Sequence, residues 1–169
     1  MKILDNITST VRDDLRMEIK KESKVSIAAA CFSMYAYKEL KKQLESVDEF
    51  RFIFTSPTFV KEKAEKQKRE FYIPRLSRET SLYGTEFEIK LRNEMNQRAI
   101  ARECADWIRE KAKFKSNTTG ENMGGFMTVD SGAIQTAYVP INGFTTVDIG
   151  CERGNNSYNM VTCMEAPHS

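Results

Sequence analysis

Hydrophobic and polar residues alternate along this chain with two different periods, and each period predicts a kind of element. Apolar residues recur at every fourth position from Val11 to Ile19, with charged residues between them. This spacing predicts an amphipathic helix that is capped by Thr8 or Ser9 and ends near Glu22. One face of such a helix should pack on a core.

Two short apolar runs follow, and both have the length of strands. Residues 25–32 are almost continuously apolar, which is typical of a strand buried on both faces. Residues 50–55 form the second expected strand, and Pro57 ends it. Between these runs, residues 35–44 have helical spacing. The first third of the chain therefore alternates helix and strand.

The middle of the chain is more polar. Residues 58–70 are dense in charge and are predicted to be helical, and residues 71–84 are expected to be irregular because proline and glycine interrupt them. Residues 85–112 are compatible with one long helix. The alternation in residues 87–91 also fits a strand, so the start of that helix stays open. Trp107 is expected to anchor the core.

The amino-acid composition changes after Lys113, where glycine, asparagine, threonine and valine become frequent. Four short strands are predicted there, at residues 113–115, 125–129, 137–140 and 158–162. Helices alternating with strands, followed by a strand-rich half, favour an α/β sandwich with a mixed sheet. A chain of 169 residues fits one such domain.

Composition narrows the class of protein. With 40% hydrophobic and 30% charged residues, the chain is neither disordered nor fibrous. A net charge of +2 does not indicate nucleic acid, so any basic site must come from local clustering. No signal peptide or long apolar run occurs, so we expect a cytoplasmic protein with no membrane partner. The cysteines contain no CxxC pair, and free buried thiols are expected at Cys31, Cys104, Cys151 and Cys163.

The last third of the chain resembles phospholipase D-like domains. Residues 104–108 resemble the helix of that domain, and residues 113–115 resemble its following strand. Residues 125–129 fall where the family has His-x-Lys, and residues 144–150 resemble its Asn-Phe-Thr-x-x-Gly-Leu segment. Residues 154–161 resemble its Asn-x-Glu strand. The resemblance implies a phospholipase D-like mixed sheet flanked by helices in a single domain.

A longer similarity covers most of the chain. Residues 71–73, 84–93, 103–107 and 143–148 resemble the N-terminal phospholipase D-like domain of large bacterial DEAD/DEAH-box (superfamily II) helicases. This resemblance implies that residues 1–169 are the N-terminal part of a longer, ATP-dependent helicase whose motor follows Ser169. No Gly-x-x-x-x-Gly-Lys-(Ser/Thr) motif occurs here, so the motor chemistry would belong to that downstream part.

The chemistry of the family depends on a histidine, and the only histidine here is His168, next to the last residue. In the family one imidazole attacks phosphorus and a second acts as general acid, while lysine and asparagine hold the phosphate. The positions that resemble this motif are Gly125, Met127, Asn142, Gly143 and Thr145. Neither glycine nor methionine can attack phosphorus, so we expect a degenerate site with no catalytic residue and no enzyme activity.

Other chemistry has weaker support, and no cofactor or metal is expected. Asp130, Asp148 and Glu152 could bind a hard cation, but solvated carboxylates are the simpler interpretation. The glycine-rich residues 120–125 could cradle a phosphate, although a plain loop is the favoured interpretation. A metal-dependent nuclease therefore stays a remote alternative.

Two basic clusters are the best indication of binding. In residues 61–79 basic side chains outnumber acidic ones and flank Phe71 and Tyr72, as suits phosphate contacts with base stacking. The candidate contacts are Lys66, Lys68, Arg69, Arg75 and Arg78. A solvated helix face is the alternative. A second cluster comprises Arg109, Lys111, Lys113 and Lys115, for which a snorkelling helix end is the alternative. The candidate contacts there are Lys113, Lys115 and Asn117.

These observations lead to two main hypotheses. The first is a non-catalytic module that binds or positions nucleic acid, DNA rather than RNA, for a helicase of DNA repair or defence. The second is an interaction module that forms a homodimer or docks on the helicase body, since single phospholipase D-like domains pair through their motif-bearing faces.

Overall fold

The structure is a computed structural model that describes residues 1–55, 94–119, 121–152 and 160–167. Its described strands form one sheet of seven, in the order β1-β7-β6-β5-β2-β3-β4. The strands are β1 (Lys2–Leu4), β2 (Lys24–Ala29), β3 (Glu49–Phe54), β4 (Ala112–Ser116), β5 (Phe126–Asp130), β6 (Ile134–Val139) and β7 (Val161–Pro167). Strands β2, β3 and β4 are parallel, and the other pairs are antiparallel. The predicted α/β class with a mixed sheet is confirmed.

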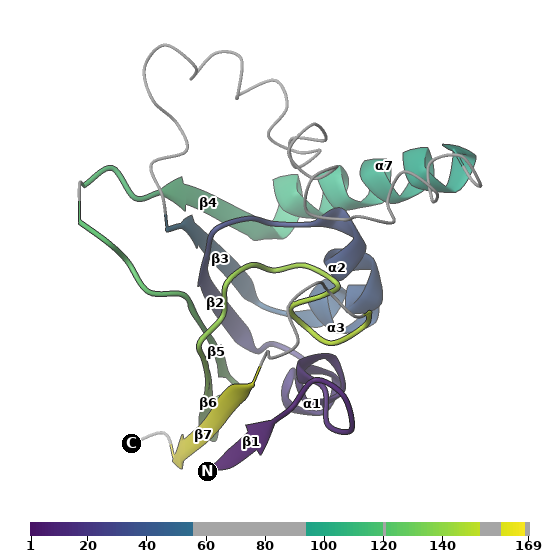
Figure 1. The fold of residues 1–169 in the computed structure, drawn as a ribbon. Coiled ribbons are helices and arrows are strands. Elements are labelled where there is room, and N and C mark those ends of the chain that lie inside the picture. Colours follow the sequence, from purple (N-terminus) through teal and green to yellow (C-terminus); the bar gives the residue numbers. More distant parts are fainter. Residues whose placement is uncertain (56–93, 120, 153–159, 168–169) are drawn as a thin grey trace.

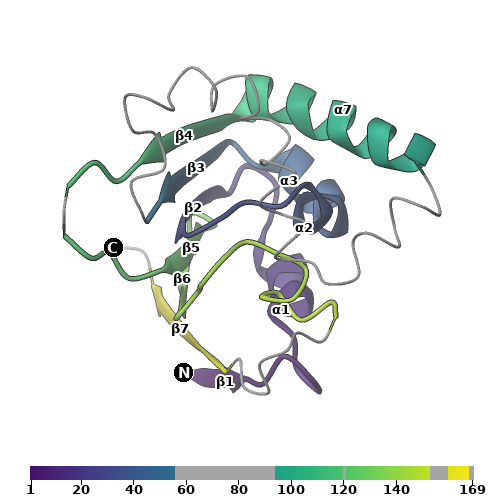
Figure 2. The same ribbon diagram turned by 45° about the horizontal axis from the view of Figure 1, so that its top comes forward.

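Helices cover one face of this sheet. They are α1 (Val11–Glu18), α2 (Met34–Glu39), α3 (Lys41–Ser46) and α7 (Glu94–Lys111). Figures 1 and 2 show all four on the same side of the strands. No described helix lies on the opposite side of the sheet.

The first helix begins later than the sequence predicted. Its cap is Thr10, whose hydroxyl accepts a hydrogen bond from the N–H of Asp13 at 3.1 Å. The expected caps belong instead to the preceding turn, because the N–H groups of Thr8 and Ser9 donate to the carboxylate of Asp5 at 2.8 and 2.9 Å. These hydrogen bonds, together with that from the hydroxyl of Thr8, hold the pKa of Asp5 below its ordinary value.

Two further elements differ from the predictions. The expected helix over residues 35–44 is two short helices, since Leu40 leaves the helical region with φ −114° and ψ 13° while its side chain is fully buried. Strand β1 was missed because three residues carry no periodic signal. Strand β1 is held in place by its pairing with β7 and by the ion pair between Lys2 and the buried carboxylate of Asp14.

Aromatic rings fill the space between the sheet and its helices. Phe50 and Phe52 alternate with outward residues along β3, and Trp107 from α7 packs on Phe50 with ring centroids 4.8 Å apart. Trp107 is 4% exposed, and its indole N–H donates to the carbonyl of Leu44 at 2.8 Å. The prediction that Trp107 anchors the core is confirmed.

The remaining predictions are partly tested. All four cysteines are free, although only Cys104 and Cys163 are buried and the other two are half-buried. None of the described helices is long and apolar enough to cross a membrane. The predicted helix over residues 58–70, the irregular residues 71–84 and the start of the helix over 85–112 lie outside the described residues.

Candidate nucleic-acid interface

The five positions that resemble the phospholipase D motif, here called the motif region, are Gly125, Met127, Asn142, Gly143 and Thr145. The structure brings Gly125 and Asn142 to the same end of β2, because the carbonyl of Asn142 accepts from the N–H of Ala30 at 2.8 Å and the N–H of Ile141 donates to the carbonyl of Gly125 at 3.1 Å. This end of the sheet is where the resemblance would place the chemistry.

No side chain fits at Gly125. A Cβ built there would lie 1.6 Å from the carbonyl oxygen of Ile141 and 3.1 Å from that of Ala28. Both are backbone atoms that rotation of a side chain cannot move. Met127 is 1% exposed and points into the core, where it cannot neutralise a phosphate. The positions of the family's nucleophile and lysine are therefore closed.

The rest of the motif region is occupied by its own contacts. A Cβ on Gly143 would lie 2.7 Å from Sγ of Cys31 and 2.9 Å from Oδ2 of Asp148. The hydroxyl of Thr145 donates to that same carboxylate oxygen at 2.5 Å, and the N–H of Asp148 donates back to the hydroxyl oxygen at 3.1 Å. Burial raises the pKa of Asp148. These polar groups stabilise a turn.

The alternative that Asp130, Asp148 and Glu152 bind a hard cation has no support from the geometry of the described residues. Among the described residues, no three His, Cys, Asp or Glu side chains are placed to hold a metal ion. Asp148 is engaged with Thr145, and the carboxylate of Glu152 accepts from the hydroxyl of Thr146 at 3.1 Å.

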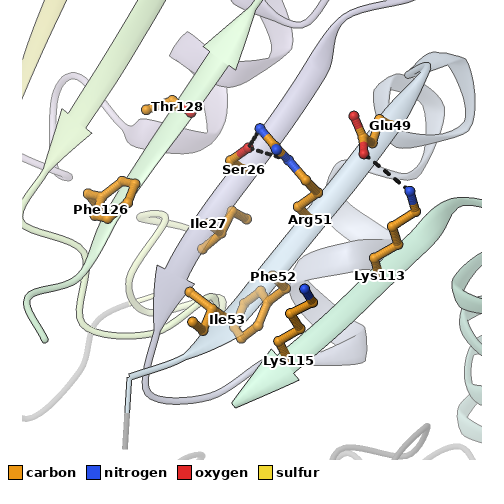
Figure 3. A pocket seen from close by; sticks show the side chains of 10 residues that line it. All are labelled: Ser26, Ile27, Glu49, Arg51, Phe52, Ile53, Lys113, Lys115, Phe126 and Thr128. Carbon is orange, nitrogen blue, oxygen red and sulfur yellow. Dashed lines mark hydrogen bonds and ion pairs between the residues drawn. The ribbon is translucent and has the colours of Figure 1, made fainter. Parts of the chain in front are cut away.

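A different set of side chains gathers on the face of β2 to β5 opposite the helices, here called the open face. Its outward residues are Ser26, Ile53, Arg51, Lys113, Lys115, Phe126 and Thr128. They line an open hollow of about 610 Å³, seen in Figure 3. The alternation of β3 and β4 explains the arrangement, because every second residue of a strand points to the same face.

Three cations lie side by side on this face. Arg51 on β3 is the register partner of Lys113 on β4, and Lys115 lies two residues further along β4. The guanidinium of Arg51 donates to the neutral hydroxyl of Ser26 at 3.1 and 2.8 Å. The ammonium of Lys113 lies 3.5 Å from a carboxylate oxygen of Glu49.

The charge of this group is only partly balanced. Glu49 is the one acidic residue among the described residues that line the hollow, against the cations Arg51, Lys113 and Lys115. Lys115 makes no ion pair with any described residue. The described lining of the hollow is therefore positive, and an anion of more than one charge would complement it.

Apolar side chains lie beside the cations. Phe126 is 36% exposed on β5, and Ile53 is half-buried on β3. Both are register neighbours of Ala28 on the strand between them. The open face thus combines the positive charge of Arg51, Lys113 and Lys115 on β3 and β4 with the apolar side chains of Ile53 on β3 and Phe126 on β5.

The sequence found part of this interface. It predicted Lys113 and Lys115, which the structure brings together, but it missed Arg51 and Phe126. Arg51 could have been found from the alternation of phenylalanine with other residues over 50–54, because this alternation points Arg51 to the face of the strand away from the core. The other predicted contacts, Lys66, Lys68, Arg69, Arg75 and Arg78, lie outside the described residues.

The prediction that Asn117 contacts phosphate is corrected by its hydrogen bonds. It is 8% exposed, and its amide donates to the carbonyls of Thr55 and Glu121, both at 3.0 Å. Its side-chain oxygen accepts from the N–H and the hydroxyl of Thr119 at 3.0 and 2.7 Å. The side chain is consumed in holding the loop after β4, so it is not available as a phosphate donor.

The fold is thus a mixed α/β architecture with an open seven-stranded sheet in its described residues. No protein-family model matches the chain, and no curated protein matches it.

Proposed function

We propose that this domain is a non-catalytic, phospholipase D-like accessory module of a DNA helicase, which binds nucleic acid through its phosphate backbone. The observation that carries the proposal is the group of Arg51, Lys113 and Lys115 on the open face, where Glu49 is the one carboxylate among the described lining residues of the hollow. The helicase context rests on the resemblance of the sequence alone.

The register of β3 and β4 explains why an anion is the expected ligand. Arg51 and Lys113 are direct cross-strand partners, and like charges at such positions destabilise a sheet. A local conflict of this kind is typical of a functional site, where a ligand removes it. A bound phosphate between the two side chains would turn their repulsion into two charge-assisted contacts.

The motif region supports a role without catalysis. The position that corresponds to the nucleophile admits no side chain, and Met127 is buried in the core. A domain with this arrangement can keep the shape of a phosphodiesterase while it lacks the reaction, because function depends on the site and not on the fold.

Fluorescence anisotropy of labelled DNA in a salt series tests the proposal. Three phosphate contacts on a single strand give an expected slope of log K against log salt of about −2. The triple variant R51E, K113E and K115E should bind at least about a hundredfold more weakly at low salt. A native chain that binds no DNA at low salt would overturn the proposal.

A matched triple variant controls for net charge. K20E, K38E and K42E make the same change in charge at exposed lysines outside the open face. This variant should keep most of the affinity, and both variants should keep the thermal stability of the native chain within a few degrees because all six residues are exposed. Equal losses in the two variants would show a general effect of charge and not a site.

The second candidate, a docking or dimerisation module, is favoured by one observation. Ile3, Val139 and Met164 are 63%, 38% and 41% exposed, and the register of β1, β6 and β7 places them on the same side as the open face. A chain that sediments as a monomer at high concentration would remove the homodimer version of this candidate.

A further inference from the structure

Two rows of side chains cross the open face from β4 to β5. The first row is Lys113, Arg51, Ser26 and Thr128. The second row is Lys115, Ile53, Ala28 and Phe126. Each row spans four strands, or about 14 Å at the usual strand spacing. Cations stand at the β4 end of both rows, while the second row ends in an aromatic ring.

This order of charge and apolar surface distinguishes between ligands. Free phosphate would use only the cations. A DNA duplex presents phosphates, but its bases are stacked inside, and its major groove of about 12 Å admits a helix or a two-stranded ribbon and not a four-stranded sheet. In either case Phe126 would have no role in binding.

A single strand has the matching order. Its phosphates lie along one edge and its unpaired bases project from the other, each with a flat face that can stack on an aromatic ring. Open sheet faces with exposed aromatic residues bind unpaired bases in this manner. In the second row Lys115 lies on β4 at one end and Phe126 lies on β5 at the other, so charge and ring are separated as such a ligand requires.

We propose that the open face binds single-stranded nucleic acid, with the phosphates along Arg51, Lys113 and Lys115 and a base stacked on Phe126. This inference rests on the proposed function and adds the form of the nucleic acid and the residue that reads it. Figure 3 shows Phe126 on β5 at one side of the hollow and the lysines on β4 at the other.

The test compares a labelled oligothymidine with a labelled duplex of the same length, using the full chain at low salt. Phe126→Ala should weaken binding of the single strand by about tenfold and leave duplex binding unchanged. Met17→Ala serves as the matched control, because Met17 is an exposed apolar residue on α1, 58% exposed, and it should change neither affinity.

A second variant reports the stacking directly. The chain has one tryptophan, Trp107, which is buried in the core. Phe126→Trp adds an exposed indole to the open face, and its fluorescence should fall when oligothymidine binds and should not change with the duplex. This readout depends on contact with a base and not on the stability of the chain.

The outcomes separate the inference from the proposed function. If Phe126→Ala weakens both ligands equally or neither, while R51E, K113E and K115E still abolish binding, the single-strand inference is overturned and the proposed function stands. If polyglutamate binds as tightly as oligothymidine, the face is a general anion site and the inference fails. If the native chain binds neither nucleic acid, both proposals fail together.

Discussion

The motif region and the open face belong to the same sheet, but they differ in what a ligand could reach. At the motif region a backbone carbonyl occupies the place of any side chain at Gly125, and Thr145 and Asp148 are bonded to each other. On the open face Arg51 and Lys115 face solvent with positive charge that no described carboxylate fully balances. The binding proposed above is therefore expected on the open face and not at the strand ends.

The two regions also differ in how their polar groups are satisfied. Buried groups must find partners within the protein, and those of the motif region do so in a turn. Solvated cations carry no such requirement and can release bound counterions to a polyanion. Resemblance of sequence locates the first region, whereas the register of the strands is needed to bring Arg51 beside the lysines of the second.

The largest expected effect is at Gly125. Gly125→Ala and Gly125→His both place a Cβ on the carbonyl oxygen of Ile141, and relief requires the backbone that precedes β5 or that follows β6 to move. We expect a loss of at least about 4 kcal/mol in the free energy of unfolding, measured in urea, and no phosphodiesterase activity from the added imidazole.

The neighbouring glycine supplies the control. A Cβ on Gly124 meets nothing within 4 Å, so Gly124→Ala should change the free energy of unfolding by less than about 1 kcal/mol. A Gly125→His variant with native stability would show that the motif region can open, and the contrast between the two regions would be lost.

Much of the fold could be predicted from local pattern. The strands β2, β3 and β4 were found within two or three residues at each end, because apolar runs and alternation define them. Strand β1 has three residues and takes its conformation from β7, which follows it by more than 150 residues in the chain. Such distant pairing leaves no mark in a local window.

The interface was harder to predict than the fold, for a physical reason. Lys113 and Lys115 are close in the chain, so a local count of charge found them. Arg51 joins them only through the parallel pairing of β3 with β4, across more than 60 residues. Asn117 was misassigned because a sequence shows the donors of an amide but not the carbonyls of Thr55 and Glu121 that accept from them.

A smaller effect is expected at Gly143, where side chains and not backbone atoms are in the way. Gly143→Ala would bring a Cβ to 2.7 Å from Sγ of Cys31, and the free energy of unfolding should fall by about 1–3 kcal/mol. Adding Cys31→Ala removes that sulfur, so the double variant should be more stable than the sum of the single changes predicts.

A double-mutant cycle in urea measures this coupling. Independent, additive losses would show that Cys31 does not close the motif region, and Asp148, at 2.9 Å from the same Cβ, would become the side chain to change next.

The smallest effect concerns the proton of Asp148. Burial raises the pKa of this carboxyl in the folded chain, while hydrogen bonds from Thr145 and the N–H of Gly143 oppose the shift. Between its unfolded pKa of about 4 and the raised folded value, the folded chain binds more protons than the unfolded one, so its stability falls as pH rises. The free energy of unfolding of the native chain should therefore decrease relative to Asp148→Asn across that window.

Urea unfolding of both chains between acidic and neutral pH measures the difference. Thr145→Val removes a hydrogen bond that lowers the folded pKa, so it should extend the upper edge of the window to higher pH. A stability difference that stays flat or rises with pH would mean that Asp148 is solvated, and the motif region would then be as accessible as the open face.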